Sequence, residues 1–149
     1  SSSDGEKGKG KGKKGCPAAE VTVDGKVMPL KLPGLGVKIK GYNGYLIHAY
    51  TYEGNTCENA LTGRGASIPQ DGFSFRVSVV PGQVNTLGAG FYTHVGLKAK
   101  ILDKPAKDGD TLSICIRKPT EFVPNIGDLK DKKVVAKGLF TAKFCGEMK

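Results

Sequence analysis

Apolar and polar residues alternate along most of this chain, and that alternation restricts its fold more than any other feature of the sequence. It is clearest in four runs, at positions 73–79, 91–101, 112–117 and 134–144. A period of two residues is the spacing of a β-strand, whose side chains point in turn to a buried and to an exposed face. No long segment has the spacing of an amphipathic helix. We therefore predict an all-β protein.

Each run divides into residues that we assign to the core and residues that we assign to the outside. In the first and third runs the core residues are Phe73, Phe75, Val77 and Val79, and Leu112, Ile114 and Ile116. In the second run, where Tyr92 and His94 are placed outside, they are Phe91, Thr93, Val95, Leu97, Ala99 and Ile101. In the fourth run they are Val134, Ala136, Phe140, Ala142 and Phe144. Half-buried strands of this kind are typical of antiparallel sheets.

Less regular strands precede these runs, at positions 20–23, 26–32, 36–40 and 45–52. The pair Asp24-Gly25 between the first two is typical of a two-residue hairpin turn. Short helical turns fit best at 58–61 and 127–132. About seven or eight antiparallel strands in a chain of 149 residues favour a β-sandwich, immunoglobulin-like in the loose architectural sense.

The four cysteines, Cys16, Cys57, Cys115 and Cys145, are widely spaced. They lack the short spacings of zinc sites, and their even number predicts two disulfides in a secreted protein. Cys115 and Cys145 fall on predicted strands, opposite the apolar stripe, so we expect each of them to bond with one of the two loop cysteines. We prefer Cys16–Cys145 with Cys57–Cys115, which joins the ends of the domain. Cys16–Cys115 with Cys57–Cys145 obeys the same rule, and Cys16–Cys57 with Cys115–Cys145 stays open.

The net charge of +9 is uneven, because lysine and glycine nearly alternate from Lys7 to Lys14, within a segment, 1–15, that contains no apolar side chain. This composition predicts a flexible tail ahead of one folded domain at 16–149. The lysines of the tail are Lys7, Lys9, Lys11, Lys13 and Lys14. Such a tail is typical of polyanion binding, but without arginine or aromatic residues it offers no nucleic-acid specificity, and solubility alone is the other explanation. No apolar stretch is long enough to cross a membrane.

Sequence patterns of catalysis and of cofactor binding are missing. There is no GxSxG or HExxH pattern, and the glycine pairs at 34–36 and 63–65 lack the spacing of phosphate-binding loops. His48 and His94 supply the chain's imidazole groups, and facing each other across a sheet with a carboxylate they could hold a metal. We predict a protein that is not an enzyme and that uses no cofactor or metal. A small metal-dependent hydrolase is an alternative.

Two regions are candidate binding surfaces. The segment 53–72 is long for a connection inside a compact domain, a property of functional loops, and its candidate contact residues are Asn55, Glu58 and Arg64. The connections 81–90 and 119–133 are further candidates. The second region is a group of tyrosines that could stack on sugar rings from an exposed sheet face, namely Tyr45, Tyr50, Tyr52 and Tyr92.

These features favour a small secreted binding protein that acts outside the cell. We expect its partner to be an extracellular protein or an acidic glycan. An effector or virulence factor that contacts another organism's proteins through its long loops is the leading hypothesis. A carbohydrate- or matrix-binding module that uses the tyrosines and the basic tail is the main alternative, and the sequence leaves the oligomeric state open.

Overall fold

The alternating runs form strands in the computed structural model of the chain, which describes residues 15–64 and 67–149. The elements are, in chain order, β1 (Glu20–Val23), β2 (Lys26–Val27), β3 (Lys31–Lys38), β4 (Tyr45–Tyr50), α1 (Cys57–Thr62), β5 (Ser74–Val79), β6 (Thr86–Ala89), β7 (Tyr92–Val95), β8 (Ala99–Asp103), β9 (Thr111–Phe122) and β10 (Val134–Glu147). The predicted all-β class is confirmed. The lysines of the predicted tail lie outside the described residues.

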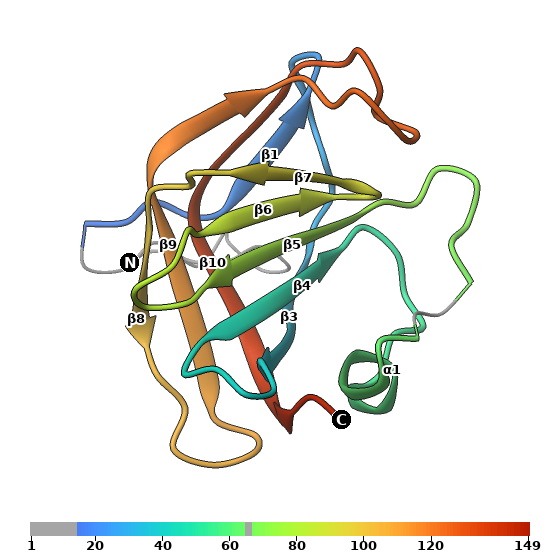
Figure 1. Ribbon diagram of the computed structural model, residues 1–149. Helices are drawn as coiled ribbons and strands as arrows, with labels where there is room; N and C mark the ends of the chain where they lie inside the picture. Colours follow the sequence, from blue (N-terminus) through green and yellow to red (C-terminus); the bar gives the residue numbers. More distant parts are fainter. Residues whose placement is uncertain (1–14, 65–66) are drawn as a thin grey trace.

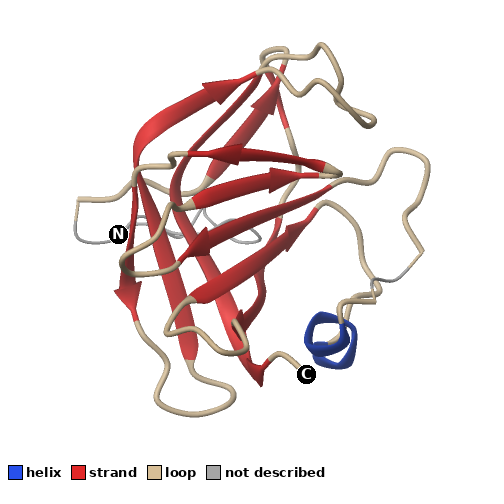
Figure 2. Ribbon diagram, viewed as in Figure 1, coloured by secondary structure: helices blue, strands red, loops and turns tan. Residues whose placement is uncertain are grey.

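One curled sheet contains all the strands of the described part of the chain (Figures 1 and 2). Its order is β2-β1-β10-β3-β4-β5-β6-β7, and β9 pairs with β10 and with β8. β10 is the central strand, because β9 occupies one of its edges while β1 and then β3 occupy the other. Every pair is antiparallel except β3 with β10, which are parallel.

The sheet forms a curled half-barrel and is not clearly divided into the two layers of the predicted sandwich. The reason is the length of β10, whose 14 residues take part in both halves of the sheet and keep them joined. The described sheet has ten strands and not seven or eight. The run 91–101 contains two strands, and the short β6, which includes Gly88, escaped the sequence analysis because its alternation is weak.

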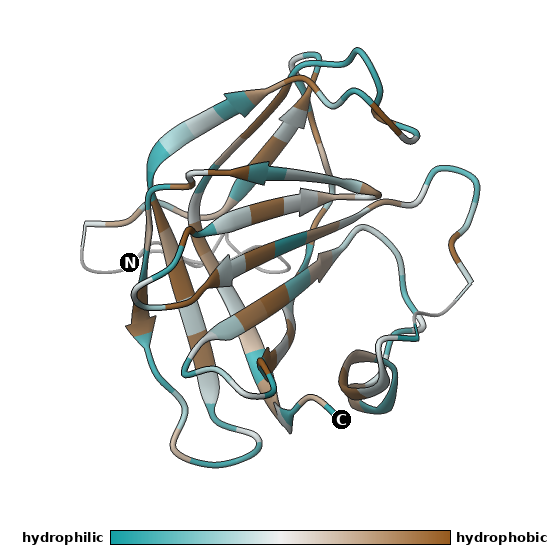
Figure 3. Ribbon diagram, viewed as in Figure 1, coloured by the Kyte–Doolittle hydropathy of each residue, from teal (hydrophilic) through white to brown (hydrophobic). Residues whose placement is uncertain are grey.

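The hydrophobic core fills the inside of the curl, and the bands of hydrophobic colour along the strands follow the alternation of the sequence (Figure 3). The inward residues assigned to the strands at 73–79, 112–117 and 134–144 are confirmed. Their fully buried members include Phe75, Val77, Leu112, Ile114 and Phe140. A close-packed apolar interior of this kind supplies most of the stability of a small domain.

The run 91–101 points the opposite way from the prediction over its first half. Phe91 and Val95 are exposed, whereas Tyr92 and His94 face the inside of the curl and stack on Phe122. The register of β7 on β6 explains the difference, since Tyr92 lies opposite Ala89 and His94 opposite Leu87, both of which face the core. A turn at Gly96 then separates β7 from β8, so the run never forms one continuous strand.

The disulfides are Cys16–Cys115 and Cys57–Cys145. Each strand cysteine is joined to a cysteine outside the strands, as predicted, although Cys57 begins α1 and does not lie in a loop. The preferred assignment was wrong. The segment before β1 runs along β10, where the Leu139 N–H donates to the Pro17 carbonyl at 2.8 Å, and Leu139 lies opposite Cys115 in the β9–β10 register. Cys145 is roughly 20 Å further along the extended strand, beyond the reach of Cys16.

Gly138 allows this N-terminal segment to cross β10. It adopts a left-handed φ of +93°, and a Cβ at this position would overlap the Ala18 carbonyl oxygen. We expect Gly138→Ala to lower the free energy of unfolding by about 2 kcal/mol more than Gly109→Ala, since overpacking typically costs 1–3 kcal/mol. Gly109 is the matched control, because its φ is +94° and a Cβ there would meet nothing within 4 Å. If urea unfolding showed the same loss of unfolding free energy for both variants, the close approach of Gly138 to the Ala18 carbonyl would be unimportant for stability.

Candidate functional site

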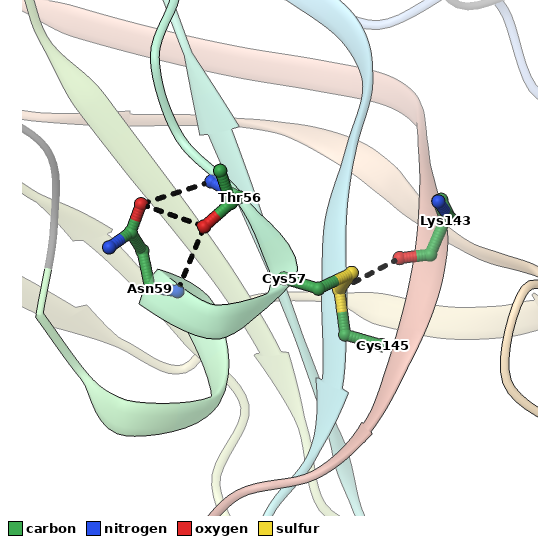
Figure 4. Close-up of a disulfide and its surroundings, with 5 residues drawn as sticks. All are labelled: Thr56, Cys57, Asn59, Lys143 and Cys145. Carbon is green, nitrogen blue, oxygen red and sulfur yellow. Dashed lines mark hydrogen bonds between the residues drawn. A yellow bond between two sulfur atoms is a disulfide. The ribbon is translucent and has the colours of Figure 1, made fainter.

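The helix α1 is attached to the outward face of the sheet, and it fixes the start of the long segment predicted to be functional. Its first turn has a capping box, in which the Asn59 N–H donates to Thr56 Oγ1 and the Thr56 N–H donates to Asn59 Oδ1 (Figure 4). The Cys57–Cys145 disulfide ties the same turn to β10. Such caps matter in a helix of only six residues, because they satisfy backbone groups that have no partner within the helix. The helical turn predicted at 58–61 is therefore confirmed.

Beyond α1 the chain reaches one end of the half-barrel, where it meets two other connections (Figure 1). These are the turn between β6 and β7 and the connection between β9 and β10. Together with the start of β5 they enclose a pocket of about 360 Å³, which we call the loop-end pocket. Its lining comes from Gly63, Ile68, Gly72 and Phe73, from Ser74 and Arg76 of β5, from Ala89, Gly90 and Phe91, and from Asp128 and Leu129.

Large apolar side chains are exposed around this pocket. Phe91 is 87% exposed and Ile68 is 60% exposed, and both line the pocket. Ile126 is also exposed, and its neighbour Gly127 lies near Phe91, since a Cβ added at Gly127 would be 3.8 Å from Phe91. Exposed apolar side chains that gather in one place, in contrast to single ones, are typical of binding surfaces.

Arg76 supplies a positive charge to the pocket. It points outward from β5, crosses Gly88 of the neighbouring strand, and donates from Nη2 to the Gly90 carbonyl at 2.6 Å. Its side chain is half-buried, and burial lowers its pKa, although an arginine stays charged. No ion pair joins Arg76 to a carboxylate among residues 15–64 and 67–149. The carboxylate of Asp128, which is exposed, lines the same pocket without pairing with it.

The residues beside Arg76 on the outward face carry no charge at neutral pH. His48 lies opposite Arg76 in the β4–β5 register, and burial, together with the charge of Arg76, lowers its pKa from 6.5 to about 4. Burial and the neighbouring Tyr52 raise the pKa of Tyr50 to about 12. The ring of Tyr50 stacks on His48 and meets Tyr52 edge-on. Arg76 is thus the one charged member of this group.

The charge of Arg76 is expected to be visible in the titration of His48. In the variant Arg76→Gln the His48 pKa rises above 4 but stays below 6.5, because burial, the larger cause of the shift, remains. An NMR titration of the His48 imidazole protons measures both values. An unchanged pKa would mean that the two side chains do not interact.

The predicted loop residues gather around α1. Asn55 is half-buried ahead of the helix, and Glu58 forms an exposed ion pair with Lys149, at 3.9 Å. Arg64 is exposed just after the helix, where its backbone N–H donates to the Asn59 carbonyl. Among the described residues of the segment 53–72, those that line the loop-end pocket are Gly63, Ile68 and Gly72.

The predicted tyrosines do not form one exposed face. Tyr45 faces the core and packs edge-on against Phe144, while Tyr92 faces the inside of the curl. Tyr50 and Tyr52 lie on the outward side, but both are more than 90% covered. A stacking platform needs accessible ring faces, so the sugar-binding surface stays a prediction that this arrangement does not favour.

The structure separates the two histidines. His48 lies on the outward face of β4, whereas His94 faces the inside of the curl and stacks on Phe122. The metal site considered for the alternative hydrolase would therefore need side chains from opposite faces of the sheet. The described residues contain no group of three or more side chains arranged to hold a metal ion.

The main residues of the loop-end pocket were not predicted from the sequence. Arg76 was placed correctly on the outward face of its strand, but nothing in the local sequence showed that loops would half-bury it. Phe91 was assigned to the core. The available signal was a charged residue at the centre of an otherwise uncharged strand, in the sequence Phe73–Val79.

No protein-family model matches the chain, and neither a curated protein nor a solved structure is significantly similar to it. The one described helix, α1, is too short and too polar to span a bilayer.

Proposed function

We propose that this chain is a secreted, non-enzymatic binding protein, and that it recognises an extracellular protein through the loop-end pocket and its apolar rim. One observation carries the proposal: connections from three parts of the chain meet around a pocket whose exposed rim includes Phe91 and Ile68. Aromatic anchors beside a small cavity are typical of the central residues of protein interfaces.

The covalent structure supports a location outside the cell. Both disulfides lie in the folded domain, and disulfides persist mainly in oxidising compartments. The finer hypothesis, an effector that contacts a protein of another organism, rests on the small size, the basic charge and the long connections of the chain. We keep it as the specific form of the proposed function.

A site-specific cross-linking experiment tests this proposal. A photoreactive phenylalanine analogue replaces Phe91 in one variant and Val84 in another. Val84 is the matched control, because it is 61% exposed and precedes β6, at the end opposite Phe91. We expect a partner from an extracellular extract to cross-link at position 91 and not at 84, and the purified partner to bind Phe91→Ser at least about tenfold more weakly than the native chain. Equal cross-linking at both positions, or none, would contradict the proposal.

A further inference from the structure

We infer that the loop-end pocket receives the C-terminal residue of the partner protein, whose carboxylate pairs with Arg76 and whose apolar side chain fills the pocket. This inference rests on the proposed function and adds the chemistry of the group that is recognised. It follows from three properties of the pocket: an uncompensated positive charge, apolar walls and a small volume.

The first property is the charge of Arg76. Arg76 is half-buried, and even partial removal of a cation from water costs free energy that an anion or several hydrogen bonds can offset. Arg76 donates a hydrogen bond to the Gly90 carbonyl and forms no ion pair with the described carboxylates. A guanidinium has five N–H donors and binds a carboxylate through two parallel hydrogen bonds. A carboxylate in the pocket would therefore supply the missing partner.

The other two properties specify what carries this carboxylate. The side chains of Phe73, Leu129, Ile68 and Phe91 give the pocket apolar walls and an apolar rim. Its volume of about 360 Å³ is near the lower end of the range for ligand sites, about 300–1,000 Å³, which suits one residue better than a long segment. A C-terminal apolar residue presents a carboxylate and a large apolar side chain together. An internal Asp or Glu presents a carboxylate without that apolar body.

The other charged and titratable groups near Arg76 determine whether a substitution strengthens or weakens the binding of an anion. Burial keeps His48 neutral, and the raised pKa of Tyr50 keeps its hydroxyl protonated. Asp128 is the acidic residue of the lining, and it opposes the binding of an anion. Removing the charge of Asp128 should therefore strengthen binding, whereas removing that of Arg76 should weaken it.

The test uses the full chain and three small probes, followed by NMR of its backbone amides. N-acetyl-phenylalanine presents both groups, its amide lacks the charge, and N-acetyl-glutamate α-amide lacks the apolar body. We expect the first to bind with a millimolar dissociation constant and to shift the signals of residues around the pocket. The amide should bind at least about tenfold more weakly, because a hydrogen-bonded charge pair contributes a factor of this size or more. N-acetyl-glutamate α-amide keeps a carboxylate but should also bind at least about tenfold more weakly, because it has no aromatic ring to bury against the apolar walls.

Four variants locate the effect. Arg76→Gln should abolish the preference for the acid over its amide, and Asp128→Asn should strengthen binding of the acid. Gly88→Ala keeps the charge but forces the guanidinium to move, because a Cβ at Gly88 would overlap it, and it should weaken binding severalfold. Arg117→Gln is the matched control, since this exposed arginine lies on β9 away from the pocket lining, and it should leave binding unchanged.

The outcomes separate this inference from the proposed function. Equal binding of the acid and its amide in the pocket would overturn the role of the carboxylate and leave the proposed function standing. Equal binding of N-acetyl-glutamate α-amide and N-acetyl-phenylalanine would overturn the C-terminal apolar residue. If no amide signal shifts, or if only signals of residues outside the pocket shift, the whole inference would be overturned. The cross-linking experiment at position 91 tests the proposed function independently of these probes. The probe comparison needs no variant, so a misfolded Arg76→Gln would not remove the test.

Discussion

Replacing both Cys16 and Cys115 with alanine is expected to lower the free energy of unfolding by about 4–5 kcal/mol, the value that the chain-entropy model gives for a loop of about 100 residues. The two cysteines are 99 residues apart in the sequence. Their bond ties the segment before β1 to the middle of β9, where the two cysteines and Leu139 form a small cluster outside the main core. A loss of this size is comparable with the whole stability of many small domains, so the variant should unfold at a much lower urea concentration.

The disulfide pairing is checked by counting free thiols in the same double variant. The structure predicts no free thiol in Cys16→Ala/Cys115→Ala, because Cys57 and Cys145 stay bonded to each other. It also predicts that a digest of the unreduced native protein contains a Cys16–Cys115 peptide. A Cys16–Cys145 peptide, or a loss of stability below about 1 kcal/mol, would contradict the described arrangement.

Acidification is expected to destabilise the protein through His48. The pKa of His48 is about 4 in the folded protein, against 6.5 for a histidine without the surrounding structure. The unfolded chain therefore binds the proton more tightly than the folded chain does. The free energy of unfolding therefore falls as the pH drops from about 6.5 to about 4, and this contribution is fully retained above that range. A shift of this size corresponds to about 3 kcal/mol at pH 4.

A comparison of two proteins isolates this effect from the protonation of carboxylates. Urea unfolding at pH 7 and at pH 4 should show that His48→Gln loses about 3 kcal/mol less on acidification than the native chain does. The variant His94→Gln controls for the loss of a histidine as such. If His48→Gln and the native chain were equally sensitive to acid, the proposed burial of a neutral His48 would be wrong.

The local pattern of the sequence was sufficient to predict the strands and most of the core. Alternation identified the inward faces of β5, β9 and β10, and the four-residue turn at 58–61 identified α1. It could not show that the sheet curls, because the curl depends on the edge of β10 opposite β9, where β10 pairs with β1 and β3, two strands that are distant in the sequence. The same pairing decides which cysteines meet, so the preferred disulfide assignment failed for the same reason.

The candidate site was predicted only in part, because it is built from long-range contacts. The segment 53–72 was singled out by its length, and it contributes Ile68 to the loop-end pocket. The orientation of Phe91 depends on the register between β6 and β7, which a run of alternating residues does not reveal. The surroundings of Arg76 likewise depend on connections that are far apart in the sequence, at 63–73, 89–91 and 128–129.

The most direct test of the loop-end pocket as the recognition site is a measurement of nuclear Overhauser effects between N-acetyl-phenylalanine and the methyl groups of the protein. The account predicts contacts from the ring protons of the probe to the methyl groups of Ile68 and Leu129, which line the pocket. Val84 and Val27 are exposed valines outside the pocket lining. Contacts from the probe to these valines, and not to Ile68 and Leu129, would contradict the account.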